Sequence, residues 1–488
     1  MYQYKKLFQK FRQNYFLILL FSKKYFNLFF LKLFSNIIII KIIMDKLQYE
    51  SNVKNKLLDP VLDVKNQRTE FRINDDGTGR VILSSMRLVG LGVFAANNVS
   101  YLAAGAAGVI KNIYLYDGNQ VLDQCMEANG WVAFTNYLEV NDQNASKDKW
   151  LMRHNMGYMV DGISPQNDQL DATNAPRSDN LYRDKMGTIP TSDSIVNNGY
   201  VDLARLLPIL SKIEAIPLAV FKNLRLVIEY DNEITKLIDK NNETTTTARP
   251  ILSFDEVVDA EEKAAITKAF KGVSWDSIEH DRVFVAANAA AGGVNVRTTQ
   301  NVNANVKNYR GKYLKKIVVQ KKAVDEAVFV ETNDVSPMGG YNSVTCINEK
   351  LNFKVNGAPK LPIDMDKAGK RLGLLNETWG ICNSYPLNAD FGNAVGAASG
   401  AAPSGPRNYF ILGQFNATTR ASQVGLQDYF GLEIEDDVRE MEINFSRDNE
   451  GTGVAATNQR YNSGLELHMW GLCNKNILLA NGRYSVSY

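Results

Sequence analysis

The residues with the most recognisable chemical spacing are glycines in the stretch RVILSSMRLVGLGVFA. A strand-like run leads into Gly90-x-Gly92-x-x-Ala95, and Asp117 ends a later strand-like segment. This spacing imitates a dinucleotide-binding turn, in which glycines let the backbone approach a pyrophosphate. Such a site needs a helix after the glycines, but the following AANNVSYLAAGAAG is interrupted by an Asn-Asn pair and two glycines. The sequence therefore predicts no cofactor here.

Side chains for catalysis or metal binding are sparse. The three histidines, His154, His280 and His468, stand in unrelated contexts, and none belongs to an HExxH or similar ligand pattern. The calcium-like stretches INDDGTG and SRDNEGTG place Arg72 and Ser446 at the first ligand position, so they indicate turns. GxSxG and GxxxxGKS/T motifs are absent from the sequence. We expect structural histidines, no metal site and no catalytic residues.

One cluster of carboxylates allows two interpretations. Glu433, Glu435, Asp436 and Asp437 fall within the short segment GLEIEDD. They could supply the acid and the base of a β-sandwich glycosidase, which needs paired carboxyl groups. A solvated strand edge explains them equally simply.

Length and composition describe a globular chain with more than one core. The chain has 488 residues, of which 45% are hydrophobic and 22% are charged. This indicates two or three domains and excludes global disorder. The cysteines are widely spaced without a CxxC pair, which fits neither a disulfide framework nor a zinc ribbon. We expect reduced, mostly buried thiols at Cys125, Cys346, Cys382 and Cys473.

Charge separates residues 1–44 from the rest of the chain. This segment holds eight basic and no acidic residues, which leaves 47 basic against 53 acidic residues, a net charge of −6, in the remainder. A mildly acidic body argues against specific binding of nucleic acid, which requires a clustered basic surface. The segment is also apolar, but lysines interrupt every run before the ~18 residues that a membrane span requires.

Three interpretations of residues 1–44 remain: an interfacial membrane arm, an unusual targeting segment, or translated upstream sequence. The segment consists largely of Phe, Ile, Lys, Leu, Asn and Tyr. This composition is typical of translated AT-rich DNA, so it favours translated upstream sequence. The segment also lacks the small-residue cleavage site of a signal peptide. We expect the mature protein to begin at or near Met44, with membrane contact only if residues 1–44 are retained.

After Met44 the chain is rich in strand signals. RTEFRIN runs into the turn DDGTG and then into RVILSSMRLV, and IYLYDGNQVLDQC is typical of a hairpin. YLKKIVVQKK and NEKLNFKVNG repeat this pattern later in the chain. Many short strands joined by Gly and Asn turns indicate an all-β sandwich or barrel.

Two segments alternate so regularly that each is expected to close a sheet. In AVFKNLRLVIEYDN, the side chains of Leu224, Leu226, Ile228 and Tyr230 share one face. The C-terminal GLELHMWGLCNKNILLANGRYSVSY contains a strand, an Asn-Gly turn and a second alternating strand. Termini usually fray, so this pattern indicates an end that is built to be buried.

One clear helix is predicted in DAEEKAAITKAFKG as a short insertion. Asp259 can cap it with Glu262 at position N3, and Ile266 and Phe270 share a face. Gly272 is expected to end the helix.

Polar and small-residue segments suggest the domain limits. Residues 239–250, DKNNETTTTARP, are the expected linker between a first domain at 45–238 and a second at 251–488. Residues 391–408 are rich in Gly, Ala, Ser and Pro and are expected to form a long exposed loop.

The order of these features resembles the double jelly-roll major capsid proteins of polinton-like elements, adintoviruses and virophages. GAAGVIKNIYLYDGNQVLDQ is similar to early strands of the first roll, and LLPILSKIEAIPLAVFKNLRLVIEYD to its closing strands. NVRTTQNVNANVKNYRGKYLKKIVVQKK resembles the opening of the second roll, INEKLNFKVNGAPKLP its middle, and QDYFGLEIEDDVREMEINFSRD with the C-terminal strand its end. The resemblance covers roughly residues 68–488 and implies two tandem eight-stranded antiparallel jelly rolls.

This resemblance implies a structural protein and not an enzyme. It implies a major capsid protein that forms pseudo-hexagonal homotrimers, which tile an icosahedral virion shell. The implied partners are neighbouring capsid trimers and a penton or minor capsid protein, with assembly in the host cytoplasm or nucleus. A jelly roll also places its last strand beside its first in the middle of a sheet, which would make Tyr488 structural.

A β-sandwich protein that binds or hydrolyses carbohydrate is the alternative. A glycan site should show clustered tryptophans in a concave face, but the five tryptophans are spread along the chain. This spread favours core or interface positions for Trp131, Trp150, Trp275, Trp379 and Trp470.

Overall fold

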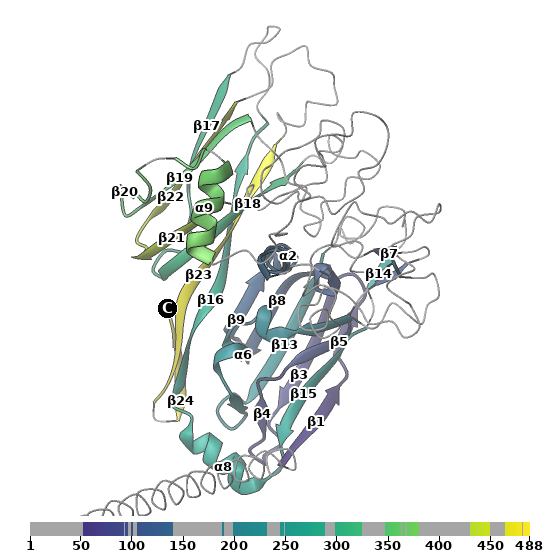
Figure 1. Cartoon of the computed structure of the whole chain (residues 1–488). Coiled ribbons are helices and arrows are strands. Elements are labelled where there is room, and N and C mark those ends of the chain that lie inside the picture. Colours follow the sequence, from purple (N-terminus) through teal and green to yellow (C-terminus); the bar gives the residue numbers. More distant parts are fainter. Residues whose placement is uncertain are drawn as a thin grey trace, which may run out of the picture. The chain divides into compact units, whose positions relative to one another are not determined.

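The computed structural model describes residues 52–91, 93–95, 99–100, 105–139, 188–189, 199–231, 245–247, 249–287, 298–324, 347–362, 364–366, 368–379, 430–448, 464–480 and 482–488. Residues 55–256 and 261–488 belong to one compact unit. Strands dominate this unit (Figure 1), which confirms the predicted all-β class. Of the helices described, none is both long and apolar enough to cross a membrane.

The first half of the chain builds two main sheets around one core. In order across the first sheet lie β2 (Leu62–Val64), β3 (Arg68–Asn74), β13 (Asn223–Tyr230), β8 (Ile110–Asp117) and β9 (Gln120–Met126). In order across the second lie β11 (Gly199–Asp202), β5 (Arg87–Leu91), β15 (Ile251–Val257), β4 (Val81–Leu83) and β12 (Ala215–Pro217), with β1 (Val53–Leu58) paired to β15. Two small sheets pair β6 (Val93–Ala95) with β14 (Thr245–Thr247) and β7 (Val99–Ser100) with β10 (Thr188–Ile189).

The second half builds a second sandwich from strands β16 to β23. One sheet has the order β16 (Gly272–Val285), β23 (Leu465–Ala480), β18 (Tyr313–Ala323) and β21 (Phe430–Asp437), with β24 (Arg483–Ser487) paired to β23. The facing sheet has the order β17 (Thr299–Asn305), β22 (Met441–Asp448), β19 (Ile347–Val355) and β20 (Ala358–Pro359). The first strand, β16, and the strand before the last, β23, thus lie side by side.

Strand β13 shows why alternation predicted a closing strand. Its apolar side chains from Leu224 to Tyr230 are buried at every second position. Leu226 lies opposite Phe71 on β3 and Leu115 on β8, so one strand fills the middle of the first sheet. This prediction is confirmed.

The C-terminal strand pair is also confirmed, but its position and burial differ from the expectation, because no residue of β24 is fully buried. β23 lies in the middle of its sheet, between β16 and β18. β24 pairs only with β23, over residues 476–480, so the terminal strand is at an edge and not in the middle. The reason is length: β18 pairs with β23 only as far as Cys473, and β24 takes the place beside the rest of β23.

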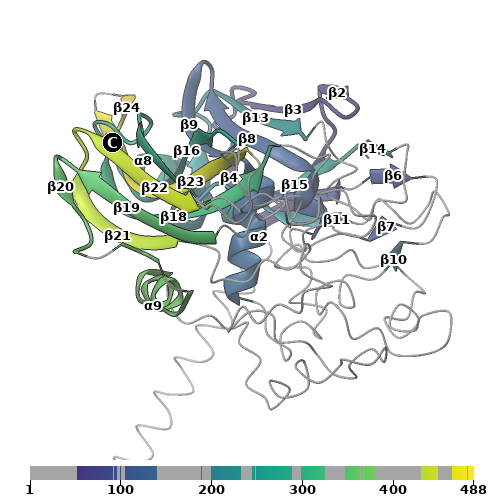
Figure 2. The same cartoon turned by 90° about the horizontal axis from the view of Figure 1, so that it is seen from above.

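The predicted helix exists as α8 (Ala260–Ala269), and none of its residues is buried. Gly272 does not end it but begins β16. Two further long helices were not predicted, α2 (Ala128–Glu139) and α9 (Ala368–Trp379). α9 lies beside β21 (Figure 2), where Leu375 reaches Gly431. Among the described residues there are also three short helical turns, η1 (Gly105–Val109), η3 (Leu203–Arg205) and α6 (Ile209–Lys212).

Strand pairing refines the expected organisation of the chain. The division at residues 239–250 stays a prediction, but β15, which follows it, pairs with β4 and β5 of the first half. The expectation that residue 251 starts the second roll is therefore wrong for this strand, because its apolar side chains Leu252 and Phe254 fill the first core. The connection to the second sandwich contains α8.

The glycine spacing that imitated a dinucleotide turn lies on strands. Gly90 belongs to β5 and Ala95 to β6, and β8 and β9 form the predicted hairpin with Asp117 opposite Gln120. Residues 391–408 lie outside the described residues, as do residues 1–44.

Gly272 provides a test of the ladder between β16 and β23. Its φ is +149°, and a Cβ added there would lie 2.2 Å from the Ile477 carbonyl oxygen. We expect Gly272→Ala to lower the free energy of unfolding by about 2 to 4 kcal/mol, from backbone strain and overpacking together. Urea denaturation measures the loss.

Gly482→Ala is the matched control. Gly482 also has a positive φ, of +73°, but no atom lies within 4 Å of the added Cβ. Gly482→Ala should lower the free energy of unfolding only by the backbone strain, about 1 to 2 kcal/mol. Equal losses in the two variants would contradict the close approach of β16 to β23.

Candidate functional site at the seam between the two halves

The carboxylate cluster of β21 lies on the surface. Glu433 and Glu435 are exposed on this edge strand, and the Tyr313 hydroxyl donates to Glu435 at 2.7 Å. Asp436 pairs with the Lys360 Nζ at 3.0 Å. These contacts support the interpretation as a solvated strand edge. In the described ranges, no three His, Cys, Asp or Glu side chains are arranged to hold a metal ion.

The fold instead gathers polar side chains where the two halves meet. β9 is an edge strand of the first sheet of the first half, and β16 is an edge strand of the sheet that contains β23. Side chains of these two strands contact each other. We call this group of residues the seam: Asp123, Gln124, Ser277, Glu279, Lys312, Lys475, Tyr484 and Tyr488.

Asp123 is the most buried carboxyl of the seam. Its Oδ2 accepts from the backbone N–H of Ile209 at 2.9 Å, and its Oδ1 lies 3.0 Å from the Ser277 Oγ. The residue is 0% exposed, and burial raises the pKa of Asp123 to about 6. Removing a carboxylate from water disfavours its charged form, which explains the direction.

Ser277 lies between two carboxyl groups. Its Oγ lies 3.0 Å from Asp123 and 3.1 Å from the Oε1 of Glu279. A single hydroxyl hydrogen cannot donate fully to both carboxylates, so the two compete for it while both are charged. Because burial raises the pKa of Asp123 to about 6, Asp123 takes up a proton at mildly acidic pH, and it can then donate to Ser277 while Ser277 donates to Glu279.

Glu279 connects four parts of the chain. It accepts from the Lys312 Nζ at 2.8 Å, the Tyr488 hydroxyl at 2.9 Å and the Gln124 Nε2 at 3.3 Å. Gln124 belongs to the first half, whereas Lys312 precedes β18 and Tyr488 follows β24. Tyr488 therefore bonds to Glu279 of β16, as a structural role for this tyrosine requires.

Lys475 is a buried cation held between aromatic rings. It is 2% exposed, and its Nζ lies 5.8 Å from the centroid of the Trp275 ring and 4.8 Å from that of Tyr488. Burial lowers the pKa of Lys475, while the charges of Asp123 and Glu279 oppose this shift. Ring faces attract cations, so the two aromatic residues compensate part of the lost hydration.

Further contacts join the halves on either side of this cluster. The Tyr484 hydroxyl donates to the Asp117 Oδ2 at 2.7 Å, and its ring lies 5.0 Å from that of Phe221. The Trp470 Nε1 donates to the carbonyl of Met126 at 3.1 Å. Each contact pairs a residue of the second half with one of the first.

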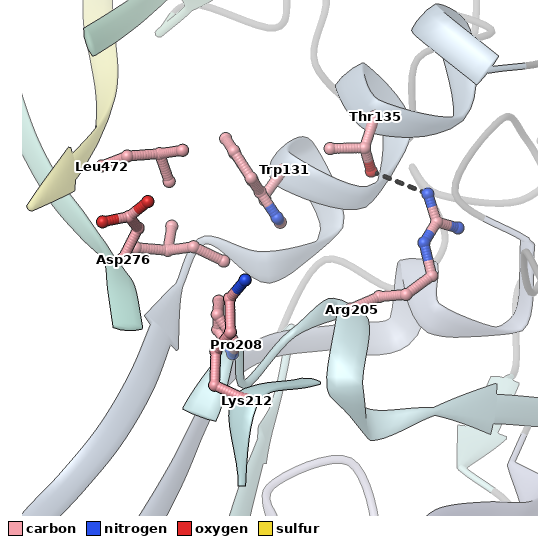
Figure 3. Close-up of a pocket in the computed structure, with 8 residues that line it drawn as sticks. Trp131, Thr135, Arg205, Pro208, Lys212, Asp276 and Leu472 are labelled. Atoms are coloured by element: carbon pink, nitrogen blue, oxygen red, sulfur yellow. Dashed lines mark hydrogen bonds between the residues drawn. The ribbon is translucent and has the colours of Figure 1, made fainter. Parts of the chain in front are cut away.

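A pocket of about 280 Å³ adjoins the seam (Figure 3). Trp131 of α2 and Leu472 of β23 line it, as do the two cationic residues Arg205 and Lys212. The Arg205 guanidinium donates to the Thr135 hydroxyl at 3.1 Å, and Asp276 pairs with Lys315 at 2.7 Å. The remaining lining residues, Pro208 and Ile278, are apolar.

The arrangement serves to hold the halves together. Its carboxyl, hydroxyl and amide groups are occupied by one another, and the cluster contains no nucleophile beside a free base. Sequence reasoning missed the seam, although one signal existed. Asp123 interrupts an apolar strand in VLDQC, and Lys475 does so in LCNKNILL.

No family model and no curated protein matches the sequence. A chain of the Sputnik virophage structure matches with a TM-score of 0.51 and 11% identity, over 89% of this chain and 88% of that chain. PBCV-1 VP54 has a TM-score of 0.47 at 10% identity, over 90% and 97% of the two chains. The mavirus major capsid protein has a TM-score of 0.47 at 8% identity, over 89% and 90%. The Sputnik match confirms the predicted fold of two tandem jelly rolls.

Asp123→Asn tests the protonated carboxyl. Since the folded pKa of Asp123 is raised from 3.8 to about 6, the native state binds more protons between these values, and stability falls as pH rises through this window. Above pH ~6, the buried charged carboxylate lowers the free energy of unfolding by on the order of 3 kcal/mol. The amide keeps the shape and can donate to Ser277, so the variant should be at least as stable as wild type at neutral pH, with a flatter pH profile.

Urea midpoints measured across the window give this profile. Asp276→Asn on the neighbouring strand removes one negative charge at a more exposed position and is the matched control. A wild-type slope retained in Asp123→Asn would contradict the assignment of the proton.

Deleting residues 484–488 should destabilise the chain by several kcal/mol. The deletion removes the ring of Tyr484 from Phe221 and the hydroxyl of Tyr488 from Glu279. Tyr484 is half-buried and Tyr488 is 42% exposed, so each contributes less than the about 1.5 to 3 kcal/mol of a fully buried side chain, and the lost pairing of β24 with β23 adds to the sum. Tyr484→Phe keeps the ring and should lose only about 1 kcal/mol, the value of its bond to Asp117. An unchanged urea midpoint in the truncated protein would contradict a stabilising role for residues 484–488.

Proposed function

We propose that this chain is a major capsid protein, the structural subunit of an icosahedral virion shell. The observation that carries the proposal is the pair of jelly rolls, which the β16–β23 ladder and the seam hold as one block. The fold likeness to the Sputnik virophage structure supports it, as does the order of strands along the sequence. A shell subunit needs a rigid body with suitable surfaces, and the described residues supply such a body.

The proposed assembly unit is a homotrimer. Each subunit contains two similar sandwiches, so a three-fold symmetric trimer has six lobes and a nearly hexagonal outline. Hexagonal blocks pack side by side into a continuous layer. Cyclic closure uses up each heterologous contact when the third subunit joins, so growth stops at this step. Weaker contacts between trimers, and with a penton or minor capsid protein, then build the shell. Membrane contact is proposed only for a form that retains residues 1–44.

Carbohydrate binding or hydrolysis is the weaker candidate. Trp131, Trp275 and Trp470 are buried, so they are not available as a sugar platform. The carboxylates of β21 are paired with Lys360 and Tyr313 on an exposed edge. A glycan array on the purified protein tests this alternative directly.

Native mass spectrometry of the full chain, and of a form that begins at Met44, tests the capsid proposal. We expect trimers in moderate salt and hexagonal particles by negative-stain electron microscopy. A folded β protein by circular dichroism that remains monomeric or dimeric at all concentrations would overturn the proposal.

A further inference from the structure

Two of the three histidines of the chain lie against each other. His280 belongs to β16 and His468 to β23, the two strands that join both halves. The Nε2 of His280 lies 3.1 Å from the Nδ1 of His468. Their exposed fractions are 5% and 0%. Two of the chain's three histidines thus meet at one buried position in the β16–β23 ladder.

Hydrogen bonding fixes the protons of the neutral pair. The Nε2 of His468 lies 3.0 Å from the Oε2 of Glu466, and a carboxylate can only accept. His468 therefore carries its hydrogen on Nε2, which leaves Nδ1 as an acceptor. The hydrogen between the rings then comes from the Nε2 of His280. The bond between the rings therefore forms while both rings are neutral.

Among the described side chains placed on this face, cations outnumber anions. Arg282 on β16 lies opposite His468, and Lys322 on β18 lies opposite Glu466, so both cations share the face of the pair. Glu466 is the anion on this face, and it already contacts the Arg282 Nη1 at 3.4 Å. Asp281 accepts instead from the backbone N–H groups of Lys307 and Asn308.

The remaining neighbours carry no charge. Gln320 of β18 lies opposite His468, is 1% exposed, and has neither its amide oxygen nor its amide nitrogen in a hydrogen bond. The Trp470 ring lies 5.4 Å from that of His280, and its Nε1 donates to the carbonyl of Met126 in the first half. A proton added to His280 meets this ring and the Nδ1 of His468, whereas the Glu466 carboxylate lies against the far nitrogen of His468.

Burial, followed by the charges of His468, Arg282 and Lys322, holds the pKa of His280 well below the usual 6.5. The unfolded chain therefore binds protons that the folded chain does not bind. Stability contributed by the neutral ring is complete above the unfolded pKa and is lost as pH falls below it.

We propose that the His280–His468 pair is an acid-sensitive switch in the β16–β23 ladder. A proton on His280 places a new positive charge beside Arg282 and Lys322, on a face where the carboxylate of Glu466 already contacts His468 and Arg282. Because the ladder supplies side chains to both hydrophobic cores, this charge loosens the two jelly rolls together. The consequence for a shell, opening at mildly acidic pH, rests on the proposed capsid function, whereas the switch in the single subunit does not.

Thermal unfolding of the isolated full chain at several values between about pH 7.5 and about pH 5 tests the switch. All variants are made in the Asp123→Asn background, because Asp123 changes stability in the opposite direction over part of this range. The parent should lose melting temperature as the pH falls. His280→Gln with His468→Gln should lose most of this dependence. His154→Gln, which removes the third histidine, should keep it.

The outcomes separate the switch from a purely structural pair. An equal pH slope in the parent and the double variant would overturn the proposal. If the double variant does not fold, NMR with labelled histidine on the parent decides, with His154→Gln identifying the remaining two signals. A His280 that stays neutral until the chain unfolds supports the switch, and free titration of His280 near 6.5 in the folded state refutes it.

Discussion

The pairing of β16 with β23 is the constraint on which the rest of the structure depends. The two strands pair over 14 positions, from Gly272 opposite Leu478 to Val285 opposite Leu465. One stretch of the ladder contributes Trp275 and Ile477 to the first core, and the other contributes residues such as Val285 to the second. A single ladder of one sheet thus supplies side chains to both cores. Separating the halves would expose the apolar side chains that the ladder places in the first core, so their burial resists that movement.

Charged groups are buried on both sides of this ladder, and each is compensated locally. In the seam, Glu279 pairs with Lys312, and Lys475 lies between aromatic rings. In the second core, Lys321 and Arg371 both contact Glu349. Burial alone would raise the pKa of Glu349, but these two cations lower it below its usual value. Buried ions add little net stability over apolar residues, so they favour one arrangement of strands over others.

Strands were easier to predict than helices and contacts. Alternation predicted β13, β23 and β24, because burying one face of a sheet imposes a period of two on the sequence. Helices α2 and α9 were missed because much of their burial comes from contacts with other elements: the ring of Trp131 in α2 lies 5.7 Å from that of Trp379 in α9. The order of strands along the chain also indicated the double jelly roll. Sequence spacing placed β15 in the wrong half, since polar linker composition does not report which sheet a later strand joins.

By itself, the sequence determined the all-β class, the hairpins and the closing strands, because these depend on side-chain periodicity and turn residues that act over a few positions. Only the tertiary structure decided which polar residues meet. Asp123 and Ser277 are 154 positions apart, and His280 and His468 are 188 apart. Asp123 interrupts an apolar strand, but nothing in its own strand shows which residue it meets, and the same holds for the other three side chains. Their chemistry arises from the register of strands distant in the sequence, which burial of two whole cores sets and no local pattern encodes.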